Sequence, residues 1–331
     1  MAFLFDHLKS HTIVTVPIPT HKFTGQTIVV TGSNSGLGLE AARELVRLDA
    51  KKVILAVRNV EKGQAALQSI LASTSCSHDV LEVWQLDLCS RASVQEFARR
   101  ANTLPRLDVL VSNAGIYVFD FEMVEGNEST ICVNVINTFL LALLLLPKIR
   151  ETSIQYGAKG VLSFTGSFVH HLTKFPERRA GNVFEELRDE VNSNMKDRYN
   201  VSKLIILLFA RELAVALAES EERGRQGHIV ANVVNPGLVN TAITRNATGA
   251  AKHVMQGMMT LLARTTEEGA RTLVIAAEGG EETHGQYLDD GKVGKVSPWT
   301  TSLDGIATQK DIWVELSREL EKIQPGIMAN V

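Results

Sequence analysis

The chain of 331 residues alternates short β-branched runs with longer segments in which apolar residues recur every three or four positions. This alternation is typical of βαβ units around a parallel sheet. The predicted strands cover residues 27–32, 52–57, 81–88, 107–113, 159–166, 228–235 and 285–289. The predicted helices cover residues 36–49, 60–73, 91–103, 124–148, 199–219 and 266–278. We therefore expect an α/β fold with a doubly wound, seven-stranded, mostly parallel sheet and helices on both faces.

No linker or repeat interrupts this series, which predicts one domain over residues 26–331 after an N-terminal extension, residues 1–25. Two connections, 168–198 and 238–265, are longer than ordinary loops and are expected to be lids, binding loops or locally disordered segments. The first should contain a short helix near residues 183–191, and it either forms one wall of a pocket or elaborates the surface. The second carries three methionines that suit either a pliable apolar lid or plain core packing: Met255, Met258 and Met259.

Composition excludes several classes of protein. With 34 basic and 37 acidic residues the net charge is −3, so no broad basic surface for nucleic acid is expected. The three cysteines, Cys76, Cys89 and Cys132, have neither disulfide-framework nor metal-site spacing. The longest apolar run, 139–147, is well short of the roughly 20 residues that span a membrane. We expect a cytoplasmic protein without a transmembrane segment.

The strongest local motif is "TGSNSGLG", residues 31–38, between the first predicted strand and the first predicted helix. Its glycines, Gly32, Gly36 and Gly38, allow a tight turn and close approach of the backbone to a pyrophosphate at a helix N-terminus. At the end of the second strand, Arg58 stands where an NAD-binding fold places an acidic residue. Its guanidinium suits a 2′-phosphate, which favours NADP, unless Arg58 is simply a solvated loop arginine.

A tyrosine and a lysine four positions apart, Tyr199 and Lys203, open an apolar helical run. Residues at this spacing lie on one helix face. Spacing alone does not distinguish a catalytic acid with its tuning cation from a surface pair.

Six motifs in this order make the chain resemble the short-chain dehydrogenase/reductase family: the glycine motif, "LDL" (86–88), "SNAG" (112–115), "TGS" (165–167), "YNVSK" (199–203) and "NPGLVNT" (235–241). The resemblance covers about residues 27–290 and implies a Rossmann-type fold. The chain is most similar to the retinol-dehydrogenase and WW-oxidoreductase-like branch, and also resembles members from fungal secondary metabolism.

The resemblance implies a catalytic set. Tyr199 would exchange the proton, with Lys203 lowering its pKa. Ser167 would hold the substrate oxygen; Ser163 shares its face but lies away from the carboxyl end of the strand. Asn134 would support a proton path to the lysine, with Asn137 as the competing choice.

The resemblance also implies the residues that contact the cofactor, NADP(H), and these include both helix residues of the Tyr–Lys pair. They are Gly32, Asn34, Ser35, Gly36, Leu37, Gly38, Arg58, Asp87, Leu88, Asn113, Ala114, Gly115, Tyr199, Lys203, Pro236, Val239 and Thr241. No metal site is expected, because the adjacent His170 and His171 point in different directions and lack a third ligand. We expect these two histidines to line the pocket or the loop.

Together these patterns predict an NADP(H)-dependent oxidoreductase that interconverts a ketone or aldehyde and an alcohol on a mid-sized apolar substrate. Two alternatives remain at this stage. One is an enzyme of the same fold that catalyses dehydration, epimerisation or cyclisation, and the other is a non-catalytic NADP-sensing regulator. The apolar run at 139–147 is best interpreted as part of a buried helix, and a homo-oligomer in which this helix lies against a partner subunit is compatible with the sequence.

Overall fold

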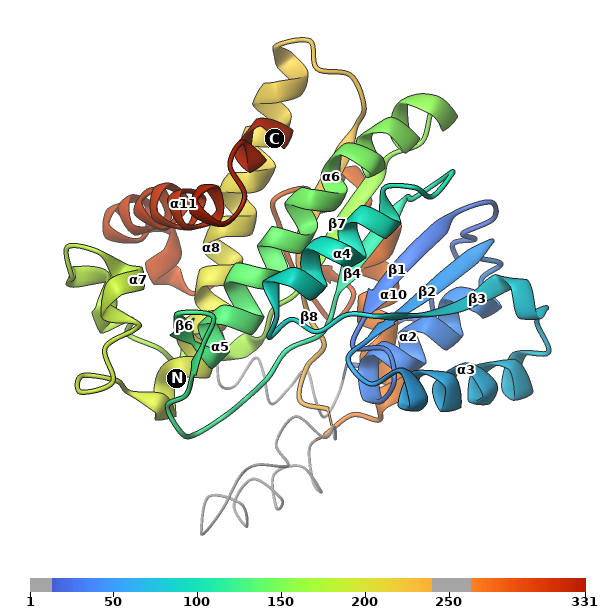
Figure 1. Cartoon of the computed structure of the whole chain (residues 1–331), viewed down its shortest axis with the longest axis horizontal. Coiled ribbons are helices and arrows are strands. Elements are labelled where there is room, and N and C mark those ends of the chain that lie inside the picture. Colours follow the sequence, from blue (N-terminus) through green and yellow to red (C-terminus); the bar gives the residue numbers. More distant parts are fainter. Residues whose placement is uncertain (1–13, 240–262) are drawn as a thin grey trace.

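The computed structural model describes residues 14–239 and 263–331. In the described residues the central sheet has eight strands in the order β10-β9-β8-β7-β4-β1-β2-β3 (Figure 1). Their bounds are β1 Thr27–Thr31, β2 Lys52–Val57, β3 Leu81–Gln85, β4 Val109–Ser112, β7 Gly160–Thr165, β8 Ile229–Asn235, β9 Tyr287–Asp289 and β10 Lys292–Val293. The first seven are parallel, which confirms the seven predicted strands. The unpredicted β10 is a two-residue antiparallel strand beside β9.

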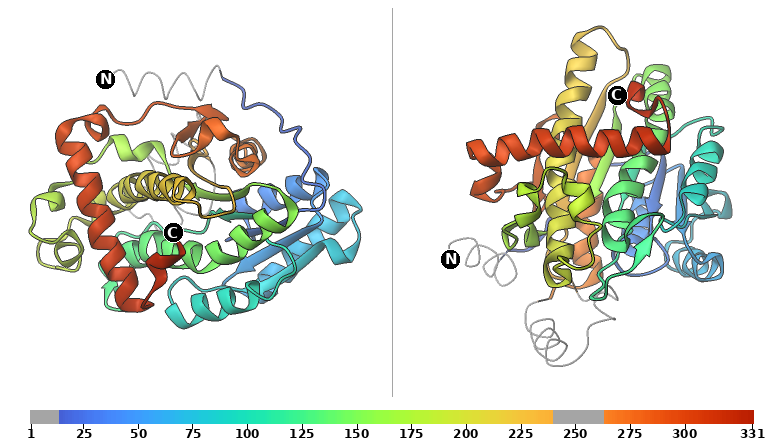
Figure 2. Two further views of the ribbon diagram at one scale, coloured as in Figure 1. Left: turned by 90° about the horizontal axis from the view of Figure 1, so that it is seen from above. Right: turned by 60° about the vertical axis from the view of Figure 1, so that its left-hand side comes forward.

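Helices cover both faces of the sheet. One layer comprises α2 (Gly36–Arg47), α3 (Val60–Thr74) and α10 (Thr266–Glu278); the other comprises α4 (Arg91–Ala101), α6 (Asn137–Tyr156) and α8 (Met195–Glu222) (Figures 1 and 2). Side chains alternate between two cores, as period-2 strands require. Val29 of β1 belongs to the core under α4, α6 and α8, whereas Ile28 and Val30 belong to the core under α2, α3 and α10. The predicted two-faced α/β architecture is confirmed.

Two predicted helices need correction, and one further helix was not predicted. The predicted helix 124–148 starts with a hairpin, β5 (Met123–Val124) and β6 (Asn127–Glu128), because the Glu128 carboxylate caps the following turn by accepting from Thr130 N and Ile131 N. The helix then runs through α5 (Ser129–Ile131), the π-turn η2 (Cys132–Ile136) and α6. The helix in the long connection, α7, is shorter than predicted and spans Val183–Glu186. The unpredicted α11 (Leu303–Ile323) lies across α8 (Figures 1 and 2).

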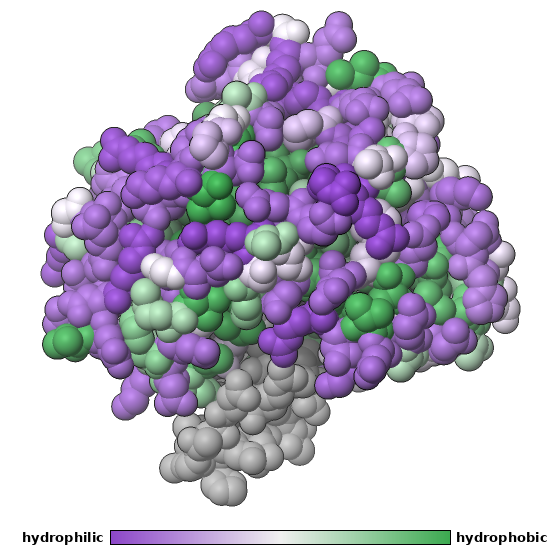
Figure 3. Space-filling model, in the orientation of Figure 1, coloured by the Kyte–Doolittle hydropathy of each residue, from purple (hydrophilic) through white to green (hydrophobic). Residues whose placement is uncertain are grey.

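One continuous helical stretch, Ser129–Tyr156, is long and apolar enough to cross a membrane. However, 94% of its most apolar window is buried inside the protein. Such burial is that of a core helix, so the stretch gives no evidence for a membrane span. On the face drawn in Figure 3 the surface is predominantly hydrophilic and apolar residues are scattered, which gives no argument for an oligomer there.

The chain reverses its direction of travel through the sheet at β1 and β4. From β1 it proceeds to β2 and β3, then crosses back to β4 and continues to β7, β8 and β9. Ligands of doubly wound sheets bind outside the carboxyl ends of the strands at this reversal. The segments that follow β1, β4, β7 and β8 therefore surround the candidate site.

Candidate active site

The turn from β1 to α2 is built around glycines. Gly32 and Gly36 have φ of 66° and 58°, in the left-handed region that favours glycine. A Cβ on Gly38 would lie 2.6 Å from Nδ2 of Asn113 and 2.7 Å from the carbonyl O of Gly32. The Asn113 side chain is held against moving away, because its Nδ2 donates to the Thr31 carbonyl O at 2.9 Å. The turn therefore brings the start of α2 against the end of β4.

This turn fits the pyrophosphate of a dinucleotide. Ser35 is the N-cap of α2, but its side chain makes no capping hydrogen bond, so the first N–H groups of the helix remain available as donors. Asn34 is half-buried and Ser35 is exposed beside them. The end of β8 lies close by, because a Cβ on Gly269 of α10 would meet Leu37, Val239 and the carbonyl O of Pro236. The predicted cofactor residue Thr241 lies outside the described residues.

A basic and an acidic residue follow the ends of β2 and β3. Arg58 is exposed directly after β2, and Asp87 follows β3 with its Oδ1 accepting from Cys89 N at 2.9 Å. Both act on the same thiol: burial and the Asp87 carboxylate raise the pKa of Cys89, whereas Arg58 opposes the rise. Arg58 and Asp87 thus both act on Cys89 from the ends of neighbouring strands, the edge at which a doubly wound sheet would hold the adenosine end of a dinucleotide. Leu88 beside them is buried.

The Tyr–Lys pair projects from the first turns of α8. Lys203 Nζ lies 5.5 Å from the ring centroid of Tyr199 and donates to the carbonyl O of Thr165, the last residue of β7, at 2.7 Å. A Cβ on Gly115 would lie 3.9 Å from Nζ, so the lysine also adjoins the segment after β4. The pair is half-buried at Tyr199 and buried at Lys203, which is not the environment of a surface pair.

Burial shifts both pKa values toward the neutral forms. It raises the pKa of Tyr199, with a further contribution from the phenol of Tyr117, and it lowers the pKa of Lys203 to about 8. The expected lowering of the Tyr199 pKa by Lys203 is not seen. The physical reason is that Nζ is directed at the Thr165 carbonyl and desolvation dominates both groups.

Ser167 lies just beyond β7, where it caps the short 3-10 helix η3 (Phe168–His171). Its Oγ accepts from Val169 N at 3.3 Å. The next peptide is fixed from β8, since Phe168 N donates to Oδ1 of Asn235 at 3.2 Å. Ser163, the alternative, is buried within β7 and does not reach the carboxyl edge of the sheet.

The two candidate asparagines have different partners. Asn134, in the π-turn, accepts from Ile116 N at 2.8 Å and donates to Ile116 O at 2.9 Å and to Ser202 Oγ at 3.2 Å. Its Oδ1 would lie 3.1 Å from a Cβ on Gly115, beside Lys203. Asn137 instead donates to the Leu88 carbonyl at 2.7 Å. The geometry places Asn134, not Asn137, beside the lysine.

The two histidines occupy different environments. His170 is 1% exposed and packs against Tyr287 of β9, with ring centroids 4.8 Å apart, so it does not line an open pocket. His171 is half-buried. Over residues 14–239 and 263–331, no three His, Cys, Asp or Glu side chains cluster as they would around a metal ion.

Sequence reasoning missed two neighbours of the site. Tyr117 stacks on Tyr199, with ring centroids 4.5 Å apart and 22° between the planes. Asn235 joins three segments, because it accepts from Phe168 N and Gly237 N while its Nδ2 donates to Asp289 at 2.9 Å. The sequence did contain a signal for Asn235, because this residue directly precedes the Pro-Gly of "NPG" at the end of a predicted strand. Nothing in the sequence indicated the partner of Tyr117.

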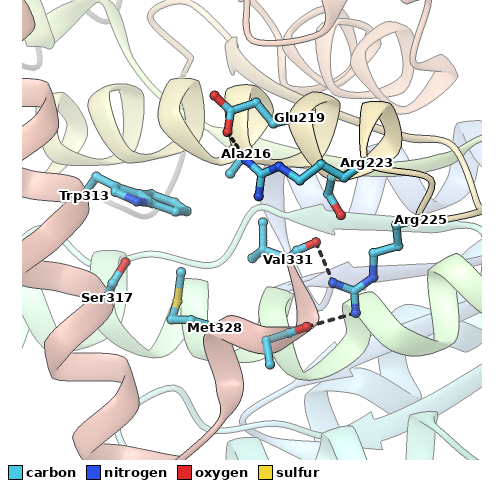
Figure 4. A pocket seen from close by; sticks show the side chains of 10 residues that line it. Ala216, Glu219, Arg223, Arg225, Trp313, Ser317, Met328 and Val331 are labelled. Atoms are coloured by element: carbon cyan, nitrogen blue, oxygen red, sulfur yellow. Dashed lines mark hydrogen bonds and ion pairs between the residues drawn. The ribbon is translucent and has the colours of Figure 1, made fainter.

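A separate hollow of about 480 Å³ lies between α8, α11 and the C-terminal residues, where Trp313, Met328 and Val331 face Arg225 (Figure 4). It adjoins Ala216 on α8. At about 1.5 Å per residue, that position is roughly 25 Å along the helix from Tyr199. The hollow is therefore not part of the candidate active site.

A glycine turn at the reversal point of a doubly wound sheet, with a Tyr–Lys pair at the same edge of the sheet, defines a dinucleotide-binding oxidoreductase class. Comparison with known proteins gives the family. The short chain dehydrogenase family model matches residues 26–252, and the chain belongs to this family. The family resemblance seen in the motifs is thereby confirmed.

Fungal relatives match nearly the whole chain. The short chain dehydrogenase/reductase dmxR8 of Cryptosporiopsis sp. is 41% identical over 100% of both chains. The short-chain dehydrogenase anuD of Penicillium roqueforti is 41% identical over 99% of this chain and 84% of that protein. Among solved structures, a short chain dehydrogenase of Shigella flexneri complexed with NADP has a TM-score of 0.58 at 23% identity, covering 82% of this chain and 99% of that one. The structural likeness supports the fold.

Proposed function

We propose that this protein is an NADP(H)-dependent oxidoreductase that interconverts a ketone or aldehyde and an alcohol on a mid-sized apolar molecule. The observation that carries the proposal is the meeting of Tyr199, Lys203 and the β7 terminus at the edge that also bears the glycine turn. A bound nicotinamide cofactor would supply or accept the hydride. The protein side chains would hold the oxygen and move the proton.

Tyr199 is the proposed proton donor for carbonyl reduction. Its raised pKa keeps the phenol protonated at neutral pH, as a donor requires. The Ser167 hydroxyl, at the end of β7, would hydrogen-bond the substrate oxygen as negative charge develops on it. The Lys203 ammonium, with Asn134 behind it, would keep positive charge beside the oxygen and hold the ribose end of the cofactor.

The cofactor would lie along the predicted residues. The glycine turn with Asn34, Ser35 and Leu37 would hold the pyrophosphate, Asp87 and Leu88 the adenine, and Asn113, Ala114 and Gly115 the strand beside the adenosine ribose. Pro236 and Val239, with Thr241, would adjoin the nicotinamide. Arg58 is exposed directly after β2, a placement that supports a 2′-phosphate and hence NADP. The solved NADP complex of a family member supports the same choice.

The apolar character of the substrate is inferred from the segment after β4. Ile116, Tyr117, Val118 and Phe119 are all half-buried, and Phe119 lies against Tyr117 with ring centroids 4.8 Å apart. Such a wall beside Tyr199 suits an apolar carbonyl compound better than a charged one. The similarity to fungal short chain dehydrogenases supports a role in fungal secondary metabolism. A cytoplasmic location stays a prediction.

The test is a screen of aromatic, alicyclic and linear ketones, aldehydes and secondary alcohols, following nicotinamide absorbance with NADPH and NADH in parallel. Turnover of an apolar carbonyl with NADPH preferred is expected. NADH preference would refute the assignment of Arg58. Consumption of substrate without a change in nicotinamide absorbance would instead indicate a dehydration, epimerisation or cyclisation. NADPH binding without any turnover would indicate a sensing role.

A further inference from the structure

The turn that carries Ser167 is held by a buried histidine. His170 lies three residues beyond Ser167, and its Nδ1 is 2.7 Å from the Ser167 carbonyl O. Its Nε2 lies 3.2 Å from the backbone N of Ser297, which must donate. The single ring therefore connects the serine to the segment that follows β10.

The two contacts determine the protonation state of the ring. Since the Ser297 N–H donates to Nε2, that nitrogen carries no proton. A neutral imidazole then has its proton on Nδ1, where it donates to the Ser167 carbonyl. Burial, with the neighbouring His171, lowers the pKa of His170 to about 3, which keeps this one tautomer over the working pH range.

Two aromatic rings pack against the imidazole of His170. Its edge contacts the Tyr287 ring on β9, and the ring of His171 lies 4.1 Å away between centroids. The Ser167 carbonyl also accepts the backbone N–H of His170 at 3.4 Å, and Phe168 N is held by Asn235. The backbone on the C-terminal side of Ser167 is thus fixed from β8 and from the 297 segment.

We propose that His170 is a positioning residue for Ser167: its Nδ1–H fixes the serine backbone, and through it the direction of the hydroxyl toward the substrate oxygen. This inference rests on the proposed function, which gives Ser167 its role. Loss of orientation by a fraction of an ångström lowers the rate of the chemical step more than it lowers cofactor binding. His170 itself touches neither substrate nor cofactor in this scheme.

A matched pair of amides separates the two contacts of the ring. In His170→Asn the amide nitrogen takes the place of Nδ1 and retains the hydrogen bond to the Ser167 carbonyl. In His170→Gln the longer amide reaches toward Ser297 instead, and the hydrogen bond to Ser167 is lost. With phenanthrenequinone and NADPH as probe substrates, we expect His170→Asn to keep kcat within about threefold and His170→Gln to lose about 10-fold to 100-fold, with KM and the NADPH Kd unchanged. His284→Gln serves as control, since His284 also links two backbone groups, Ala231 N and the Ala214 carbonyl O, and does not contact His170 or Ser167.

Two results would overturn the inference: equal loss of kcat in both amide variants, or no loss in either. Unfolding temperatures measured alongside identify a variant that fails to fold. Heteronuclear NMR of wild-type imidazole nitrogens gives an independent readout, in which a His170 proton on Nε2 contradicts the inference. Adding His170→Gln to Ser167→Ala should cause no further loss. If Ser167→Ala alone is fully active, the proposed role of the serine fails instead.

Discussion

Tyr117 stacks face to face on Tyr199, with ring centroids 4.5 Å apart and planes 22° apart. Nζ of Lys203 lies 5.5 Å from the centroid of the Tyr199 ring. The Tyr199 ring thus has an aromatic neighbour from the segment after β4 and a cation from its own helix. Its orientation depends on packing as well as on the helix that carries it.

Replacing Tyr117 by leucine should lower kcat by roughly 3-fold to 10-fold, because an aromatic pair contributes about 1 kcal/mol beyond its buried area. Tyr117→Phe keeps the ring and should stay near the wild-type rate. Steady-state kinetics of both variants test this. A Phe variant as slow as the Leu variant would show that the Tyr117 hydroxyl, not the stack, matters.

Removing the Arg58 guanidinium should weaken NADPH and leave NADH unaffected. Hydrogen bonds to a charged group contribute about 1.5–3 kcal/mol, so Arg58→Ala should raise the NADPH Kd about 10-fold to 100-fold. Fluorescence titration with both cofactors measures the change. The control is Lys62→Ala, which removes an exposed cation from the neighbouring helix α3. Equal weakening of NADPH and NADH would contradict the 2′-phosphate assignment.

A methyl group at Gly38 should disrupt the cofactor turn. Its Cβ would come within 2.6 Å of Asn113 and 2.7 Å of the Gly32 carbonyl. Gly38→Ala should therefore cost about 1–3 kcal/mol of unfolding free energy and abolish NADPH binding. Gly181→Ala is a matched control, since nothing lies within 4 Å of its Cβ position. Denaturant unfolding and NADPH titration give the two readouts, and a fully stable, NADPH-binding Gly38→Ala would refute the close packing of this turn.

His228 makes stability depend on pH. Its Nδ1 and Nε2 lie 2.9 Å from Glu221 and Glu281, and although burial opposes charge, these carboxylates raise the pKa of His228. A raised pKa in the folded state means that the stabilisation is fully present below the unfolded pKa of about 6.5 and is lost as pH rises through the folded pKa.

His228→Gln should therefore lower the unfolding free energy near pH 6, by up to about 1 kcal/mol because the site is partly exposed. The difference from wild type should shrink above the folded pKa and in high salt. Urea unfolding across this pH range measures it. A difference that grows with pH would contradict the sign.

Local patterns predicted most of the fold. The strands, and the placement of Tyr199 and Lys203 on one helix face, were predicted from patterns within short segments, which the sequence displays directly. The helix Leu303–Ile323 was missed although Ile312, Leu316 and Leu320 recur at helical spacing, because the prediction followed the βαβ series, which ends before it.

Tertiary placement accounts for what could not be predicted at the site. That Tyr117 would meet Tyr199 depends on the path of an irregular segment after β4, which has no periodic signal. That His170 would turn inward while His171 stays half-buried depends on how Ser297 returns to the sheet edge. The burial that raises the Tyr199 pKa likewise arises from the assembled site and not from the Tyr–Lys spacing.

The central claim is that Tyr199 moves the proton, and the rate of NADPH oxidation by Tyr199→Phe tests it most directly. With a carbonyl substrate identified in the screen, we expect kcat to fall by about 100-fold or more, because a positioned acid contributes about 10²-fold to 10⁴-fold. NADPH binding should stay measurable, since the ring is retained. A Tyr199→Phe variant that binds NADPH and turns over at nearly the wild-type rate would contradict the account.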